Sequence, residues 1–352
     1  MTDYKAELNA EQLDVVLHGD GPCVVLAGAG SGKTRTIVYR VAYLLEHGVR
    51  PDRILLLTFT NKAAKEMMDR IGGILGSVSP GGRGGIWGGT FHSVANRLLR
   101  MFSASSGFTE RFTILDEEDS KALFKACMNE MGFDGKNKRF PSPSIIKHVV
   151  SYARNAMVPV AQATEKLQPK FAGFADEFAR IADAYDRKKR LANAMDFDDL
   201  LIRLYELLSA DRHLRERLTA QFEYILVDEY QDTNALQAAL IRLLAREDAP
   251  NLLVVGDDAQ SIYSFRAADV RNILDFERFY RGVRIFKLET NYRSSPEILG
   301  LANDIINRNV DQYPKRLKSV SPSGAKPKVV TKASASQEAE YVAGEIERLV
   351  DD

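Results

Sequence analysis

The stretch CVVLAGAGSGKT, residues 23–34, decides the fold class, because it joins a short apolar, β-branched run to a glycine-rich loop. A helix is expected to open directly afterwards, at Lys33. Three similar runs follow along the chain: RILLLTF from Arg53, YILVDE from Tyr224 and NLLVVGD from Asn251. Runs that are apolar on both faces are typical of central strands in a parallel sheet covered by helices. The sequence therefore predicts an α/β fold with functional residues at the carboxyl ends of these strands.

The loop after the first run has the pattern of a phosphate-binding P-loop, AGAGSGKT, except that Ala27 replaces the usual first glycine. Its glycines allow successive N–H groups to point at phosphate oxygens, beside the positive end of the following helix. Lys33 is expected to contact the β- and γ-phosphates, and Thr34 to place a hydroxyl on Mg²⁺. An ordinary glycine-rich turn with an exposed lysine is disfavoured by the strand, the spacing and the helix. The expected cofactor-binding residues of the loop are Ala27, Gly28, Ala29, Gly30, Ser31, Gly32, Lys33 and Thr34.

The third apolar run, which begins at Tyr224, ends in two carboxylates, in the sequence YILVDEYQD. Asp228 is expected to hold Mg²⁺ directly or through water, and Glu229 to orient and deprotonate the attacking water. Adjacent residues of an extended chain point to opposite sides, which allows the two roles. A lone Asp-Glu pair could equally be a solvated acidic turn, but beside a P-loop it indicates ATP hydrolysis.

The run NLLVVGD is followed by a polar and aromatic segment, DAQSIYSFR. Gln260 can hydrogen-bond the γ-phosphate or the lytic water and change partners when the phosphate leaves. Tyr263, Phe265 and Arg266 combine aromatic faces with a cation, a chemistry suited to stacking on unpaired bases. Without an ATP site nearby they could equally be core aromatics. Their closeness to the phosphate-sensing glutamine favours the nucleic-acid interpretation.

Composition limits the class of protein. The chain has 352 residues with 48 Lys+Arg against 48 Asp+Glu, so any grip on a nucleic acid must be local. Its 45% hydrophobic and 27% charged residues are typical of a soluble globular protein. Two cysteines, Cys23 and Cys127, form no disulfide framework, which favours the cytoplasm. The opening MTDYKAELNAEQLD does not resemble a signal peptide, and no membrane partner is expected.

The chain is long enough for two or three domains at roughly 100 to 200 residues each. Helix-like periodicity between about Asp116 and Asp198 predicts a mostly helical insertion. From Val283, the strand-like VRIFKLE and the helix opened by SSPE predict the start of a further α/β domain. The stretch SVSPSGAKPK from Ser319 is expected to be a linker or surface loop. The expected units are 1–108 with 197–281, 109–196, and 282–352.

Two basic stretches allow two interpretations each. Gly135 to Thr164 contains no acidic residue, so it could touch duplex phosphates or be an ordinary solvated face. Its basic residues are Lys136, Lys138, Arg139, Lys147 and Arg154. The run Lys315, Arg316 and Lys318 has the same two interpretations.

Taken together, the motifs LNAEQ, AGAGSGKT, TFTNKAAKEM, GGTFHS, VDEYQDTN, GDDAQSIYSFRAAD and LETNYRSS resemble the UvrD/PcrA/Rep family of superfamily 1 DNA helicases. They cover Leu8 to Ser295 in the family's order. The resemblance implies a RecA-like P-loop parallel sheet flanked by helices, with a mostly helical inserted subdomain and a partial second α/β domain. It also implies ATP and Mg²⁺ as cofactors, single-stranded DNA and single-strand/duplex junctions as partners, and 3′-to-5′ movement. Accessory repair or replication proteins would be further partners.

The resemblance gives roles to further nucleotide residues. Gln12 is similar to an adenine-reading glutamine, although Asn9 and Gln12 also fit a helix capping box, and both interpretations stay open. Arg35 resembles a residue that helps hold the nucleotide, and Tyr292 the aromatic that stacks on the base. Arg293 resembles an arginine finger that stabilises charge on the γ-phosphate, against the alternative of a surface arginine before a helix.

Contacts with single-stranded DNA are implied for Phe59 and Asn61 in TFTN and for His92 in TFHS, which could otherwise be a polar turn residue. Two departures from the family matter. Phe265 stands where several relatives carry tryptophan, so base stacking is expected to be weaker. The sequence also stops soon after NYRSS, so we expect an amino-terminal fragment or short paralogue with little unwinding alone. The alternatives are a non-motor nucleotide- and nucleic-acid-binding module, or the motor portion of a helicase-nuclease.

Overall fold

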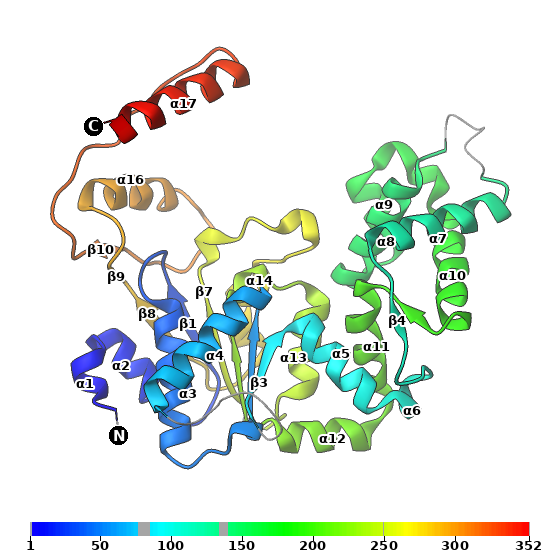
Figure 1. Cartoon of the computed structure of the whole chain (residues 1–352), viewed down its shortest axis with the longest axis horizontal. Coiled ribbons are helices and arrows are strands. Elements are labelled where there is room, and N and C mark those ends of the chain that lie inside the picture. The colour runs from blue at the N-terminus through cyan, green and yellow to red at the C-terminus, as the bar shows by residue number, and fades with distance from the viewer. Residues whose placement is uncertain (1, 77–84, 134–139, 249, 352) are drawn as a thin grey trace.

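A parallel sheet forms the middle of the molecule (Figure 1). The structure, a computed structural model, describes residues 2–76, 85–133, 140–248 and 250–351. Within them the main sheet has six strands in the order β3-β2-β6-β7-β1-β8, all parallel. The strands are β1 (Cys23–Ala27), β2 (Ile54–Thr58), β3 (Trp87–Thr90), β6 (Tyr224–Val227), β7 (Asn251–Gly256) and β8 (Arg284–Leu288). The four apolar runs are the four central strands, so the predicted α/β fold is confirmed.

Both faces of the sheet are buried under helices, because successive residues of each strand point to opposite sides. Val24 and Leu26 belong to one hydrophobic core, and Val25 with Ala27 to the other. The first core is covered by α5 (Phe91–Met101), α11 (Phe197–Ala210), α12 (Arg212–Gln221) and α13 (Ala235–Leu244). The second is covered by α2 (Ala10–Val16), α3 (Lys33–Glu46) and α4 (Asn61–Leu75). Because the strands are parallel and packed on both faces, their carboxyl ends lie together along one edge of the sheet.

A helical insertion lies to the right of the sheet in Figure 1 and has a hydrophobic core of its own. Phe124, Ile146 and Phe178 are among its fully buried side chains. Its helices are α7 (Glu117–Glu130), α8 (Pro143–Ala156), α9 (Val160–Leu167) and α10 (Ala175–Leu191). The chain leaves and returns through two paired strands, β4 (Thr113–Ile114) and β5 (Ala194–Met195). The segment is mostly helical, as the periodicity indicates, while the exact division at 109–196 stays a prediction.

The position of VRIFKLE differs from the sequence prediction. It is expected to open the further domain, but as β8 it pairs with β1 and extends the first sheet, with Cys23 opposite Arg284 and Leu26 opposite Lys287. Without β8, the edge of buried β1 would leave its backbone N–H and C=O groups unpaired, which is costly. Leu288 is also buried in the core beneath α2 and α3. The main sheet therefore continues past residue 281, the expected end of the first unit.

The remaining C-terminal elements are small and more exposed. Strands β9 (Thr290–Asn291) and β10 (Lys318–Ser319) pair with each other, and α16 (Pro296–Ile306) lies between them in sequence. Helix α17 (Ala335–Asp351) has no buried residue among those described. The short helices are α1 (Tyr4–Glu7), α6 (Ser103–Ser106), α14 (Arg271–Leu274) and α15 (Phe276–Phe279). Short 3-10 helices occur at Pro51–Arg53, Pro169–Phe174, Tyr230–Asp232, Asp258–Gln260 and Ser264–Arg266.

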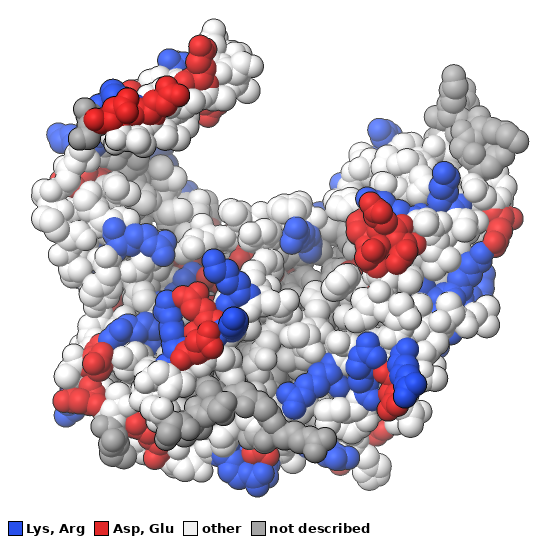
Figure 2. Space-filling view, viewed as in Figure 1, with Lys and Arg blue, Asp and Glu red and all other residues white. Residues whose placement is uncertain are grey.

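Charges of both signs are interspersed over the face drawn in Figure 2, and acidic side chains gather along α17. The same view is hollowed between the helical insertion and the segment carrying α16 and α17. Because charges of both signs are mixed on this face, recognition of a polyanion there would depend on local groups, as the zero net charge suggests.

Among the described helices, none has the length and apolar character that crossing a membrane would require.

Candidate functional site

The P-loop connects β1 to α3 and depends on two glycines. Gly30 and Gly32 have φ angles of +73° and +88°, in the left-handed region that favours glycine. A Cβ atom on Gly32 would lie 2.5 Å from Gln12 Nε2, and one on Gly30 would lie 2.6 Å from Arg293 Cβ. Any larger residue would therefore strain the backbone and displace a neighbouring side chain. The loop is thus shaped for close approach of its backbone to a ligand.

Lys33, the first residue of α3, contacts the carboxylate that follows β6. Its Nζ lies 2.9 Å from Glu229 Oε2, although 196 positions separate the two residues. Glu229 has φ +50°, and this turn directs its side chain to the P-loop. The side chains of Lys33 and Glu229 are 11% and 34% exposed. A phosphate group bound at the loop would compete with Glu229 for the same ammonium group.

Asp228 lies behind this ion pair and is buried. Its Oδ1 atom has no hydrogen-bond partner in the described part of the chain. Burial and then the charge of Glu229 raise the pKa of Asp228 to about 7. A buried carboxylate with a free oxygen suits a hard divalent cation, which would favour its ionised form. Asp228 therefore fits Mg²⁺ as a ligand, while Thr34 lines the cavity described next and its predicted contact with Mg²⁺ stays a prediction.

Most predicted nucleotide residues meet in one cavity of about 520 Å³. The predicted residues that line it are Ala29, Gly30, Gly32, Lys33, Thr34, Arg35, Glu229, Gln260, Tyr292 and Arg293. Tyr292 is half exposed; its N–H donates to Gly30 O (2.9 Å), and its hydroxyl accepts from Asn9 Nδ2 (2.7 Å). Arg35 donates to the Glu7 carboxylate (2.7 Å) at the rim. The cavity thus presents cations, an amide and an aromatic ring to one ligand.

Gln12 is held behind the loop. It forms the predicted capping box with Asn9, in which each residue's backbone N–H donates to the other's side chain. Its Nε2 also donates to the Ser31 carbonyl (3.0 Å), and the residue is only 3% exposed. The capping interpretation is confirmed, and the adenine-reading role stays a prediction.

Gln231 is a site residue that the sequence reasoning missed. Its Nε2 donates to Glu229 Oε2 (2.9 Å), and its Oε1 accepts from the N–H of Asp257 (3.0 Å). It therefore connects the ends of β6 and β7. Asp257 in turn accepts a hydrogen bond from Gln260 Nε2 through Oδ2. In the sequence, the role of Gln231 was indicated only by its position two residues after Glu229 in VDEYQD. Its contact with Asp257 depends on the pairing of β6 with β7, which the local sequence does not reveal.

The aromatic residues line a second cavity, of about 650 Å³, at the same edge of the sheet. The ring centroids of Phe59 and Tyr263 are 5.1 Å apart, and those of Tyr263 and Phe265 are 5.8 Å apart. Arg266 lies 5.9 Å and 5.7 Å from the centroids of Tyr263 and Phe265. Phe265 is 57% exposed, so the core interpretation is wrong for it, and Phe59 is 36% exposed. Their open faces suit base stacking.

The other two predicted DNA contacts differ from each other. His92 lines the aromatic cavity, and burial lowers its pKa while Asp198 acts in the opposite direction. Asn61 is exposed at the first residue of α4 and is not among the residues that line the cavity. Its predicted contact with DNA stays a prediction.

The helical insertion contributes residues to the aromatic cavity that sequence reasoning missed. Tyr152 and Asn155 of α8 line it, together with Asp198 at the start of α11. Asn155 Nδ2 donates to Asp198 Oδ1 (2.8 Å), and Asn155 Oδ1 accepts from Asn234 Nδ2 (2.9 Å). No local pattern marks these residues, because tertiary packing alone brings them to the sheet edge.

Three basic residues of the two stretches, Lys147, Arg154 and Lys315, form internal ion pairs. Lys147 contacts Glu117 (2.6 Å) and Arg154 contacts Asp186 (2.7 Å), which leaves both less available to phosphates. Lys136, Lys138 and Arg139 lie outside the described residues. Lys315 is only 5% exposed and pairs with two carboxylates, so neither the solvated-face nor the phosphate interpretation holds for it.

Comparison with known proteins agrees with this geometry. The model of the UvrD/REP helicase N-terminal domain matches residues 8–281, and that of the UvrD-like helicase C-terminal domain matches residues 286–352. The ATP-dependent DNA helicase UvrD1 of Mycobacterium tuberculosis is 39% identical over an alignment 352 residues long, which covers 98% of this chain. The ATP-dependent DNA helicase PcrA of Bacillus subtilis is 40% identical over 344 residues, or 97% of the chain. The chain spans 45% of the length of each of these two relatives. It belongs to the UvrD/REP helicase family.

Proposed function

We propose that the chain carries the ATP-hydrolysing motor of a DNA helicase that moves 3′ to 5′ along single-stranded DNA. The observation that carries the proposal is the contact between Lys33 and Glu229, which joins the P-loop to the acidic residues that follow β6. The aromatic cavity opens at the same sheet edge. The names of the relatives, ATP-dependent DNA helicases, support the same assignment.

The Lys33–Glu229 pair explains how nucleotide binding would start the reaction. In the observed arrangement Lys33 forms an ion pair with the carboxylate of Glu229, the group that would act as the general base. A γ-phosphate would draw the Lys33 ammonium away and free Glu229 to accept a proton from water. Asp228 and Thr34 would hold Mg²⁺, which supplies charge neutralisation at the phosphates. The base would thus become free when its substrate is present.

Arg293 and Gln260 would complete the site from other elements. The Cβ of Arg293 lies beside Gly30, so its guanidinium can reach phosphate oxygens on which charge develops. Gln260 lines the same cavity and is three residues from Tyr263 of the aromatic cavity. A change of partner by Gln260 would therefore be passed directly to the base-stacking residues.

The test compares the intact gene product with Lys33→Ala and Glu229→Gln. Each variant is expected to lose single-strand-stimulated ATP hydrolysis by about 100-fold or more, since general-base and phosphate-binding groups have effects of this order. Lys65→Ala on the exposed side of α4 is the matched control. Full DNA-stimulated hydrolysis by either site variant would refute the assigned roles. Unwinding of duplexes with a 3′ tail, compared with a 5′ tail, tests the polarity.

A further inference from the structure

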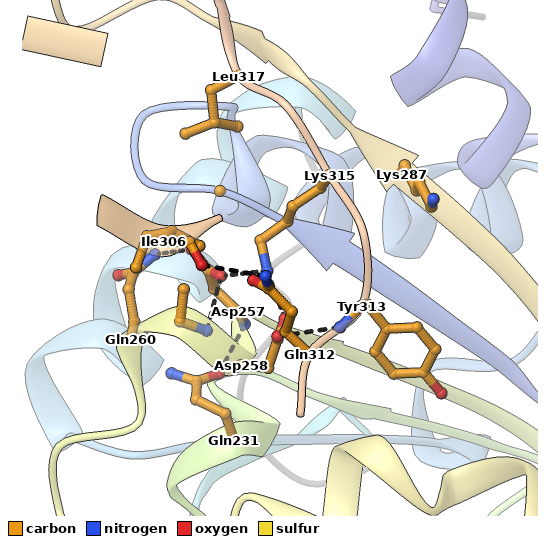
Figure 3. A network of polar contacts seen from close by, with 12 residues as sticks. Gln231, Asp257, Asp258, Gln260, Lys287, Ile306, Gln312, Tyr313, Lys315 and Leu317 are labelled. Carbon is orange, nitrogen blue, oxygen red and sulfur yellow. Dashed lines mark hydrogen bonds and ion pairs between the residues drawn. The ribbon is translucent and has the colours of Figure 1, made fainter. Parts of the chain in front are cut away.

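Residues 313–317, here called the strap, cross the carboxyl edge of the main sheet and contact the phosphate-sensing region (Figure 3). Lys315 Nζ lies 2.8 Å from Asp257 Oδ1 and also contacts Asp258 Oδ1. The N–H of Tyr313 donates to Asp258 Oδ2 (3.2 Å). Leu317 covers Gly28 so closely that a Cβ there would lie 2.3 Å from Leu317 Cδ2. The strap thus touches both the P-loop and the end of β7.

The opposite side of the strap is fixed to the C-terminal elements. Asn303 of α16 exchanges two hydrogen bonds with the backbone of Leu317, at 3.0 and 3.1 Å. The strap is also held to the main sheet beside β8, where Lys287 Nζ donates to the Pro314 carbonyl (2.6 Å) and Glu289, directly after β8, accepts from the N–H of Arg316 (2.7 Å). Any movement of α16 relative to the main sheet would therefore pull on the strap.

Asp257 joins the strap to the predicted phosphate sensor. Its Oδ1 pairs with Lys315 while its Oδ2 accepts from Gln260 Nε2, as Figure 3 shows. Asp257 is 3% exposed and the Lys315 side chain 5%, so water can replace neither partner easily. Removal of the lysine would leave Asp257 and Asp258 as adjacent buried carboxylates without their cation, which is strongly unfavourable.

We propose that Lys315 is a positioning residue for Gln260, and the proposal rests on the function proposed above. By fixing the Asp257 carboxylate, Lys315 sets the place from which Gln260 turns to a γ-phosphate. When Gln260 turns to the γ-phosphate, Asp257 stays paired with Lys315 and is not left as an unpaired buried charge. The strap thereby links the position of α16 to the reading of the γ-phosphate.

The test measures how strongly the intact protein distinguishes a γ-phosphate. Dissociation constants for Mg²⁺-ADP and Mg²⁺-AMP-PNP are measured by displacement of a fluorescent nucleotide, and their ratio is the readout. Gln260→Ala is expected to lower the preference for AMP-PNP about fivefold or more, in the range of ordinary coupling energies. Lys315→Met is expected to lower it by a similar factor while the ADP constant stays unchanged.

The double variant separates positioning from simple structural support. Because Lys315 acts through Gln260, Lys315→Met is expected to add nothing in the Gln260→Ala background. Lys315→Arg should keep most of the preference for AMP-PNP. Lys318→Met, at an exposed position directly after the strap, should keep all of it. If Lys315→Met does not fold, Asp257→Asn replaces it, since it removes the charge but keeps an acceptor for Gln260.

Two results would overturn the proposal in different ways. If Gln260→Ala lowers the preference but Lys315→Met or Asp257→Asn does not, or if the two effects add, only the positioning role fails. If Gln260→Ala itself leaves the preference unchanged, the γ-phosphate role of Gln260 fails as well. Equal loss of ADP and AMP-PNP binding in Lys315→Met would mark the lysine as purely structural.

Discussion

The interior of the helical insertion and the carboxyl edge of the main sheet contain the same kinds of groups in different arrangements. In the insertion, Lys189 is 1% exposed and pairs with three carboxylates: Asp186 (3.3 Å), Asp196 (2.8 Å) and Asp199. At the sheet edge, Lys33 is 11% exposed and pairs with one carboxylate beside a cavity. Aromatic rings differ in the same way, since Phe178 is fully buried and Phe265 is 57% exposed.

This difference separates groups that hold the fold from groups that are free to meet a ligand. The carboxylates around Lys189 each have a cation within 3.6 Å, and Tyr185 adds a hydrogen bond to Asp196 (2.8 Å). Asp199 Oδ1 has no hydrogen bond either, but it lies 3.6 Å from Arg203 Nη2, whereas Asp228 Oδ1 has neither a hydrogen bond nor an ion pair among the described residues. Burial without full pairing costs stability, so such a group points to binding.

The largest expected effect contrasts the two lysines. Lys189→Met should destabilise the 352-residue chain by about 3–5 kcal/mol, because buried carboxylates lose their cation. Lys33→Met should cost about 1 kcal/mol or less, since its partner Glu229 is 34% exposed and can be hydrated. Urea unfolding followed by far-UV circular dichroism measures both changes.

The neighbour of Lys189 offers the control for this comparison. Lys188→Met, one position earlier on α10, removes a contact with Glu130 that is much more exposed and should shift the transition little. Equal destabilisation by Lys33→Met and Lys189→Met would mean that both clusters are structural, and the distinction between the two regions would be lost.

The next effect concerns the pH dependence of stability. Because the pKa of Asp228 is about 7 in the folded chain and near 3.9 when unfolded, its contribution to stability is lost as the pH rises from about 4 through 7. Asp228→Asn removes this titration. The variant should exceed the wild type at pH 8 by up to about 4 kcal/mol, and the gap should shrink towards pH 4.

The single tryptophan allows the pH dependence of stability to be measured in the domain that contains the main sheet. Trp87 is 4% exposed in β3, so its fluorescence reports urea unfolding of the domain that contains Asp228. Asp69→Asn on the exposed side of α4 is the control and should show no such pH dependence. A stability gap that widens as the pH falls would contradict the raised pKa.

Sequence reasoning succeeded where chemistry follows from position along the chain. The apolar runs predict strands, and parallel strands bring their carboxyl ends to one edge, so the meeting of Lys33 with Glu229 could be foreseen. It failed where a residue's role depends on partners distant in sequence. Asn155 meets Asn234 79 positions away, and Lys315 meets Asp257 only because the chain returns over the sheet.

The smallest effect tests the exposed aromatic face. Phe265→Ala should weaken binding of a short oligo-dT by about 1–3 kcal/mol, the usual contribution of one base-stacking ring. The salt dependence of binding should not change, because no phosphate contact is lost. Fluorescence anisotropy at two salt concentrations measures both quantities. Phe279→Ala, at an equally exposed ring outside the aromatic cavity, is the control.

Phe265→Trp sharpens the same measurement. Phe265 is 57% exposed, so a larger ring has room, and tighter binding by about two- to fivefold is expected from its greater stacking area. Weaker binding would mean that the cavity, with Tyr263 at 5.8 Å, is already filled by the smaller ring. Unchanged binding in both variants would place Phe265 with buried Phe178 among the residues that serve only the fold. The contrast between the two regions would then apply to their charges and not to their aromatic rings.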